Sequence, residues 1–199
     1  MTLAPGPQTV IGAAGDTITG GSGADLINAI AGPERITGGS GATTVWGGAG
    51  DMITGSTGAG SSTVIGAAGD TITGGSGSDL INGTLGSQAI TGGSGSTTVW
   101  GGPGDRITGG SGSLTVDIDN VNFPGAELVG DSGVSGSDTV TGFSQTSGDR
   151  IFFPNDTTAA INSVVATAQS SNGNTLITLP DGATMTLIGI TKIDSTFFL

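Results

Sequence analysis

The sequence predicts an all-β chain wound into a parallel β-solenoid with two opposed sheets, followed by a small C-terminal β-rich cap with one short helix. Two observations predict the solenoid. The segment 9–54 returns almost verbatim as the segment 63–108, with 36 of 46 paired positions identical. Within each copy, a branched apolar residue recurs at every eighth or ninth position, with a single longer step between Ile53 and Val64. A short fixed period with one buried residue per step is typical of a solenoid.

The branched apolar residues that set this period are called the core positions. They are Val10, Ile18, Ile27, Ile36, Val45, Ile53, Val64, Ile72, Ile81, Ile90, Val99, Ile107 and Val116. Each is expected to point inward from a short strand, flanked by two outward residues and preceded by a Gly-rich turn. The 41 glycines are compatible with an ordered chain because the period is strict and each step needs a tight turn.

The residue after each core position indicates that the strands form two sheets. After every second core position, beginning with Ile18, this residue is a threonine: Thr19, Thr37, Thr54, Thr73, Thr91 and Thr108. A coil with three sides would scatter these threonines over three faces. The sequence therefore predicts that they stack in one column, where stacked hydroxyls suit an exposed sheet.

The outer face of the other sheet is expected to be adhesive. Its outward apolar residues are Leu26, Trp46, Ile65, Leu80 and Trp100, and these include both tryptophans of the chain. A soluble monomer seldom exposes such a patch. We expect either the C-terminal segment or a second copy of the chain to cover it.

Composition excludes several classes of function. Sixteen acidic residues against four basic ones give a net charge of −12, which disfavours nucleic acid and anionic membranes as partners and favours cations. No run approaches the ~18 apolar residues that insertion into a membrane requires. The chain has no His, Cys or Tyr, so the usual nucleophile–base pairs cannot form, and we expect no enzyme.

The repeat ends near residue 119, where the composition shifts, so we predict a solenoid domain over 1–119 and a capping domain over 120–199. Residues 133–141 form a last imperfect repeat and 149–153 read as a strand. A short helix is expected from Asp156 through Ala168, because apolar residues recur there at helical spacing. Residues 174–179 and 185–190 read as a hairpin around Pro180-Asp181-Gly182. All six phenylalanines lie beyond residue 120, so this segment can build an ordinary compact core.

Residues 20–28 and 74–82 match the nonapeptide G-G-x-G-x-D-x-U-x. The chain therefore resembles the RTX (repeat-in-toxin, hemolysin-type) calcium-binding proteins. This resemblance implies a β-roll in which two nonapeptides make one turn, with Ca²⁺ held in the turns by Asp carboxylates and Gly carbonyls. The segment 140–199 resembles the tail of type I-secreted bacterial proteins. That likeness implies a cap that carries a secretion signal, a partner in the type I secretion machinery, and a secreted or cell-surface location; a cap without any role in export stays open.

Candidate calcium ligands lie two residues before each core position, because flexible Gly-rich backbone and hard oxygen donors suit this cation. The acidic ones are Asp16, Asp25, Glu34, Asp51, Asp70, Asp79, Asp105 and Asp138. Consecutive acids such as Glu34, Asp51 and Asp70 repel one another unless a cation lies between them. Four of the turns at this edge, however, are one residue short. The alternative is a tight turn capped by Asp, whose carboxylate accepts backbone N–H groups without a metal.

The favoured function is that of a secreted, calcium-binding structural protein that self-assembles into a homo-oligomer, surface layer, filament or matrix. Two alternatives stay open. One is an adhesin or ice-binding rod that uses the threonine column, although the neighbouring outward positions are too irregular for good ice matching. The other is a calcium-dependent folding and export module with no binding activity of its own.

Overall fold

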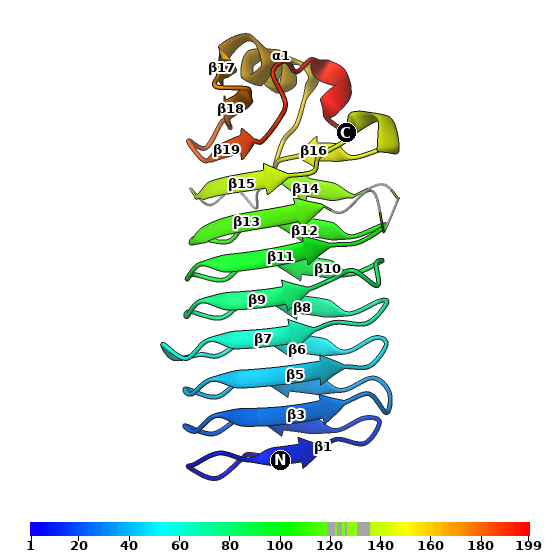
Figure 1. Ribbon diagram of the computed structural model, residues 1–199, viewed down its shortest axis with the longest axis vertical. Coiled ribbons are helices and arrows are strands. Elements are labelled where there is room, and N and C mark those ends of the chain that lie inside the picture. The colour runs from blue at the N-terminus through cyan, green and yellow to red at the C-terminus, as the bar shows by residue number, and fades with distance from the viewer. Residues whose placement is uncertain (119–121, 123–124, 126, 131–135) are drawn as a thin grey trace.

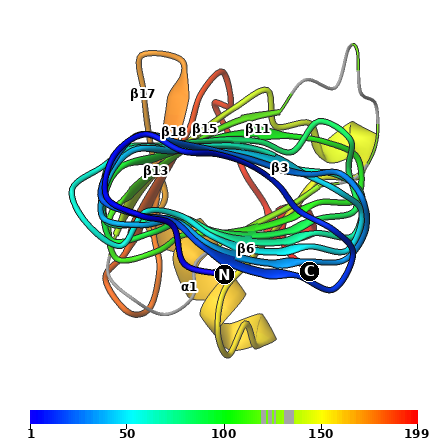
Figure 2. The ribbon, with the colours of Figure 1, turned by 90° about the horizontal axis from the view of Figure 1, so that it is seen from below.

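The computed structural model describes residues 1–118, 122, 125, 127–130 and 136–199. The chain winds into a parallel β-solenoid whose strands alternate between two opposed sheets (Figure 1). Viewed along the coil, successive turns superpose and the sheets face each other across a narrow interior (Figure 2). The predicted fold class is confirmed, and the coil is compatible with a β-roll.

The long sheet has eleven strands and the short sheet has eight. In spatial order, the long sheet contains β1 (Thr9–Ile11), β3 (Asp25–Ala29), β5 (Thr43–Gly47), β7 (Ser62–Ile65), β9 (Asp79–Asn82), β11 (Thr97–Gly101), β13 (Ser113–Ile118), β15 (Ser137–Thr141), β19 (Thr184–Leu187), β18 (Asn174–Thr178) and β17 (Gln169–Ser171). The short sheet contains β2 (Thr17–Thr19), β4 (Arg35–Thr37), β6 (Met52–Thr54), β8 (Thr71–Thr73), β10 (Ala89–Thr91), β12 (Arg106–Thr108), β14 (Leu128–Gly130) and β16 (Arg150–Phe152).

The strand register stacks like residues on like. Ile18, Ile36 and Ile53 pair in consecutive strands of the short sheet, and the other core positions continue the two inward columns. Apart from the half-buried Val10, each core position is at most 2% exposed. Because the interior holds about one such residue per strand, the coil is stabilised by a line of Ile and Val side chains and by the hydrogen bonds between turns.

The parallel ladder continues past the last regular repeat. Strand β14 pairs with β12 and β15 pairs with β13, so that Val129 and Val140 extend the two core columns. Strand β16, which realises the predicted strand near residue 150, then pairs with β14. The predicted domain boundary between residues 119 and 120 lies outside the described residues and stays a prediction. Residues 133–135 of the expected last repeat lie outside them.

The cap closes one end of the coil (Figure 1). Helix α1 (Thr158–Thr167) and the antiparallel hairpin of β18 and β19 confirm the expected elements, and β19 joins the hairpin to β15 in parallel. Ile161 and Val164, on the inner face of the helix, are buried. The short 3-10 helices η1 (Gln145–Ser147) and η2 (Ser195–Phe197) complete the cap.

Candidate functional site

The residues two positions before the core residues form two columns, one at each edge of the coil, and they include all the predicted ligand positions. The tight corner, at the edge with the short turns, contains Asp16, Glu34, Asp51, Asp70, Gln88, Asp105, Glu127 and Asp149. The glycine corner, at the other edge, contains Gln8, Asp25, Thr43, Ser62, Asp79, Thr97, Leu114 and Asp138. The side chains of these residues are buried, except for the exposed Asp16 and the half-buried Gln8.

Four aspartates of the tight corner close their own turns with one carboxylate oxygen: Asp16, Asp51, Asp70 and Asp105. Their Oδ2 atoms accept a backbone N–H from the residue three positions earlier. The N···O distances are 2.9 Å from Ala13 to Asp16, 2.8 Å from Gly48 to Asp51, 2.7 Å from Ala67 to Asp70 and 2.9 Å from Gly102 to Asp105. The shortened turns permit this contact because their last glycine, such as Gly50 with φ +84°, adopts a left-handed conformation.

Most corner aspartates also bond the neighbouring turn. Their Oδ1 atom accepts the backbone N–H of the residue that occupies the same corner one turn earlier. In the tight corner, the N···O distances are 2.7 Å from Glu34 to Asp51, 2.9 Å from Asp51 to Asp70, 2.8 Å from Gln88 to Asp105 and 3.1 Å from Glu127 to Asp149. In the glycine corner, they are 3.1 Å from Gln8 to Asp25, 2.9 Å from Ser62 to Asp79 and 3.3 Å from Leu114 to Asp138. One carboxylate therefore joins two turns.

Hydroxyl groups replace carboxylates at some glycine-corner positions. The Ser56 N–H donates to Ser62 Oγ at 2.6 Å, and the Gly93 N–H donates to Thr97 Oγ1 at 3.1 Å. The Gly21 N–H makes the corresponding bond to Asp25 Oδ2 at 2.6 Å. A neutral acceptor thus closes the turn as the carboxylate does.

Three longer side chains interrupt the tight corner. Both carboxyl oxygens of Glu34 and both polar side-chain atoms of Gln88 are buried without a hydrogen-bond partner. They lie against Gly12 and Gly66, where an added Cβ would collide with them. Among the described residues, no donor reaches the carboxyl oxygens of Glu127 either. Its interacting group is the Asp149 carboxylate, and two carboxylates bond each other only when one carries a proton.

The electrostatics follow from burial. Burial, and then the charges of Asp51 and Asp16, raise the pKa of the Glu34 carboxyl. Burial also raises the pKa of Asp51 and Asp70 despite the N–H groups that bond them, and it raises that of Asp105 to about 6. Burial first, and then the neighbouring Asp149, raise the pKa of Glu127 to about 9. The tight corner therefore carries less negative charge than its composition suggests.

The corners differ from the calcium sites that the resemblance implies. Within the part of the chain that the structure describes, no group of three or more His, Cys, Asp or Glu side chains lies close enough to hold a metal ion. The corner aspartates stack one per turn, and backbone N–H groups occupy oxygens that a cation would need. Calcium prefers six to eight oxygen donors that converge on it, and these carboxylate oxygens instead accept backbone N–H groups.

The outer face of the long sheet bears the predicted apolar patch. Trp46 and Trp100 are 42% and 43% exposed, Ile65 is 36% exposed, and Leu26 and Leu80 are half-buried. Trp46 pairs with Ile65 in the next strand, whereas Trp100 lies between Asn82 and Asp117. The expectation that the C-terminal segment covers this patch is wrong: the cap extends the coil at its end (Figure 1), and both tryptophans are exposed.

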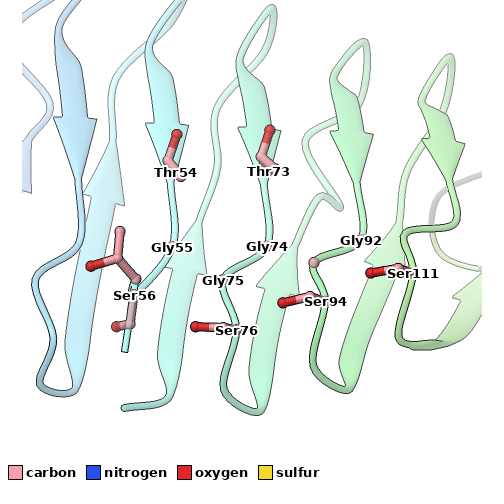
Figure 3. Close-up of a pocket in the computed structure, with 12 residues that line it drawn as sticks. Thr54, Gly55, Ser56, Thr73, Gly74, Gly75, Ser76, Gly92, Ser94 and Ser111 are labelled. Atoms are coloured by element: carbon pink, nitrogen blue, oxygen red, sulfur yellow. The ribbon is translucent and has the colours of Figure 1, made fainter. Parts of the chain in front are cut away.

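The outer face of the short sheet carries the predicted threonine column. Thr19, Thr37 and Thr54 pair in register, and the column continues through Thr108. Beside it, at the Gly-rich turns, lies a shallow groove of about 460 Å³. Figure 3 shows the hydroxyl groups of Thr54, Thr73, Ser76, Ser94 and Ser111 along this groove. Its floor is glycine backbone.

Sequence reasoning missed two corner residues, Glu127 and Asp149. Both obey the rule that identified the others, because they lie two residues before the core residues Val129 and Ile151. The irregular spacing of the chain around residue 120 hid them.

Comparison of the chain with protein-family profiles and with curated proteins finds no match. The class of protein is defined by the fold alone: a parallel β-solenoid with two sheets and a cap. Among the described residues, no helix has the length and apolar content to cross a membrane.

Proposed function

We propose that this protein is a structural protein that self-assembles by pairing the outer face of its long sheet with the same face of a second copy. The observation that carries the proposal is the exposure of both tryptophans on that face. Aromatic residues are enriched, and charged residues depleted, at the centres of protein interfaces.

The charge distribution supports the same surface. Two columns of outward residues run along the middle of the long-sheet strands, the odd-numbered strands from β1 to β15. The only charged side chain in these two columns is Asp117. The first column consists of Thr9, Leu26, Thr44, Thr63, Leu80, Thr98, Thr115 and Thr139, and the second of Ile11, Asn28, Trp46, Ile65, Asn82, Trp100, Asp117 and Thr141. A chain with a net charge of −12 would repel a second copy on most surfaces, and this face avoids that repulsion.

The area of this face determines how strongly two copies are expected to dimerise. Eight strands spaced at ~4.8 Å, with about five residues each at ~3.3 Å, span roughly 600 Å² per copy, or ~1,200 Å² for a pair. This area lies at the lower limit for specific interfaces, so we expect a reversible dimer.

Head-to-tail stacking of coils is the less favourable arrangement. Strands β1 and β2 are the outermost strands at one end of their sheets, but the other end of the coil carries the cap. The long sheet ends there in the antiparallel strands β18 and β17, which do not continue the parallel ladder. Face pairing requires neither end.

Sedimentation velocity over a concentration series tests the proposal. Replacing both tryptophans with Asn, the residue at positions 28 and 82 of the same column, makes the face polar and is compatible with the strands. We expect the wild type to dimerise and the Trp46→Asn/Trp100→Asn variant to dimerise at least about 100-fold more weakly, because each buried aromatic anchor contributes ~2 kcal/mol or more.

The control variant is Leu85→Asn, which removes an exposed apolar side chain from a turn outside the patch. It should dimerise like the wild type. A wild type that stays monomeric up to millimolar concentration, or a tryptophan variant that dimerises normally, would contradict the proposal.

Export by the type I machinery and folding outside the cell are supported only by the resemblance of the repeats and tail, and they stay predictions. Calcium binding stays a prediction as well. A folding and export module without binding activity would show neither face pairing nor a ligand.

A second candidate function is that of an adhesin that binds a glycan, or a rod that binds ice, through the threonine column. The groove beside the column favours it, because stacked hydroxyls repeat there once per turn. If this candidate holds, replacing Thr37, Thr54 and Thr73 with tyrosine should abolish binding on a glycan array and thermal hysteresis, while circular dichroism stays unchanged. Equal binding by this variant would exclude the column.

A further inference from the structure

We propose that the corner aspartates hold successive turns together by direct hydrogen bonds from backbone N–H groups to their carboxylates, and that the coil therefore folds without calcium. The inference concerns how the coil is stabilised, and it is independent of the proposed self-assembly. It departs from the calcium ladder that the resemblance implies.

Backbone N–H groups point at the buried carboxylates of the tight corner. Asp51, Asp70 and Asp105 are at most 1% exposed, and both carboxylate oxygens of each accept a backbone N–H. Each N–H group presents the positive end of a dipole to the carboxylate. A cation beside these oxygens would face that positive end, whereas calcium needs further oxygen atoms directed at it.

The ligand position in the glycine corner tolerates neutral hydrogen-bond acceptors. Ser62 and Thr97 stand in the glycine corner where Asp25 and Asp79 stand on other turns, and their hydroxyls accept the corresponding backbone N–H. A hydroxyl can replace a carboxylate as a hydrogen-bond acceptor, but it supplies no charge to hold a divalent cation. The feature that these residues share is the accepted bond.

The two copies of the duplicated segment carry different residues at one corner position. Glu34 in the first copy aligns with Gln88 in the second. Both side chains are buried at the same corner, and their polar ends lie against the equivalent glycines Gly12 and Gly66. A ladder that required a metal at every turn would lose a ligand charge at Gln88, whereas the Gln88 N–H still donates to the Asp105 carboxylate on the next turn.

Without the corner carboxylates, buried backbone N–H groups of the neighbouring turns would lack hydrogen-bond acceptors. The N–H groups of Glu34 and Gln88 point into the corner and reach Asp51 and Asp105, respectively. Buried N–H groups without acceptors destabilise a fold strongly. The carboxylate on the next turn satisfies each of these donors, so every such aspartate links two turns.

Thermal unfolding in EDTA and in millimolar calcium, followed by circular dichroism, tests the inference. We expect the melting temperature of the wild type to differ by less than about 2 °C between the two conditions. We expect Asp70→Ala to lower it by about 5–15 °C, equally in both, because two N–H groups lose their acceptor. Asp181→Asn, at an exposed position of the cap hairpin, keeps the oxygen that accepts the Ala183 N–H, so it is the control and should change little.

Asp79→Ser provides a variant that folds even if Asp70→Ala does not, since serine occupies the same corner at position 62. It should keep the β-sheet signal and show no response to calcium. Calorimetric titration of the folded wild type with calcium should show no stoichiometric binding. A melting temperature that rises with calcium in the wild type but not in Asp79→Ser, or stoichiometric binding, would overturn the inference.

Discussion

Gly39→Ala is expected to destabilise the coil by more than about 4 kcal/mol, because the added methyl group collides with backbone and not with a movable side chain. A Cβ on Gly39 would overlap the carbonyl oxygen of Gly21 and lie 2.6 Å from the carbonyl carbon of Gly20. These atoms belong to the neighbouring turn at the glycine corner. Relief of the overlap requires the two turns to separate, which breaks the hydrogen bonds between them, such as that from Ser40 N–H to Gly21 carbonyl.

Thermal unfolding measured by circular dichroism checks this expectation. A loss of this size corresponds to a fall in melting temperature of roughly 10 °C or more for a chain of this length. Ser40→Ala, on the next residue of the same turn and exposed, is the matched control and should unfold within a few degrees of the wild type. If Gly39→Ala unfolded at the wild-type temperature, the turns could not be stacked in the register described.

The stacking itself could be predicted from the sequence because it follows from period alone. Thr19, Thr37 and Thr54 share one column in the structure, as their spacing predicts. Each strand has a single inward core residue, so the pattern of apolar residues determines both the strand and the face of the sheet. The outward direction of Trp46 and Trp100 follows from the same alternation.

The role of the corner side chains could not be predicted in this way. An inward carboxylate suits a cation and a backbone N–H equally well, and the one-letter sequence of residues 47–51 does not say which donor or cation reaches Asp51. The distances from Gly48 and Glu34 distinguish the two arrangements. The cap shows the same limit: its helix and hairpin could be predicted from local pattern, but its place at the end of the coil depends on the pairing of β19 with β15.

The continuation of the coil past residue 119 was predicted only in part, as an imperfect repeat over 133–141 and a strand over 149–153. The steps from Val116 to Val129, Val140 and Ile151 are all longer than the regular period of the repeat. The burial of these side chains shows that they are core residues all the same. A solenoid tolerates longer turns because the turns lie on the outside of the stack.

Stability should fall as the pH rises from about 5 to 9, because the structure keeps a buried carboxyl protonated. The pKa of Glu127 is about 9 in the folded chain, against an ordinary value of 4.5. Above the ordinary value, the unfolded chain releases this proton while the folded chain retains it. The stabilising contribution is therefore complete below pH ~4.5 and is lost as the pH rises through the folded pKa. Asp105, whose pKa is about 6, acts in the same direction over the lower part of this range.

The carboxyl groups that act on Glu127 are those of Asp149 and Asp105, and both raise its pKa through their negative charge. Deprotonation at alkaline pH would place like charges close together in the tight corner. Because water partly screens such charges, we expect the melting temperature to fall by about 5–10 °C between pH 5 and pH 9.

The variant Glu127→Gln isolates the contribution of this carboxyl to the pH dependence of stability. Glutamine keeps the shape of the side chain and carries no proton that titrates. It should match the wild type at pH 5, exceed its melting temperature at pH 9, and lose most of the decline between them. Asp181→Asn, an exposed acid in the cap, should leave the decline unchanged. A wild type whose stability rises from pH 5 to pH 9 would show that Glu127 is ionised in the folded chain, and the tight corner would then need another source of positive charge.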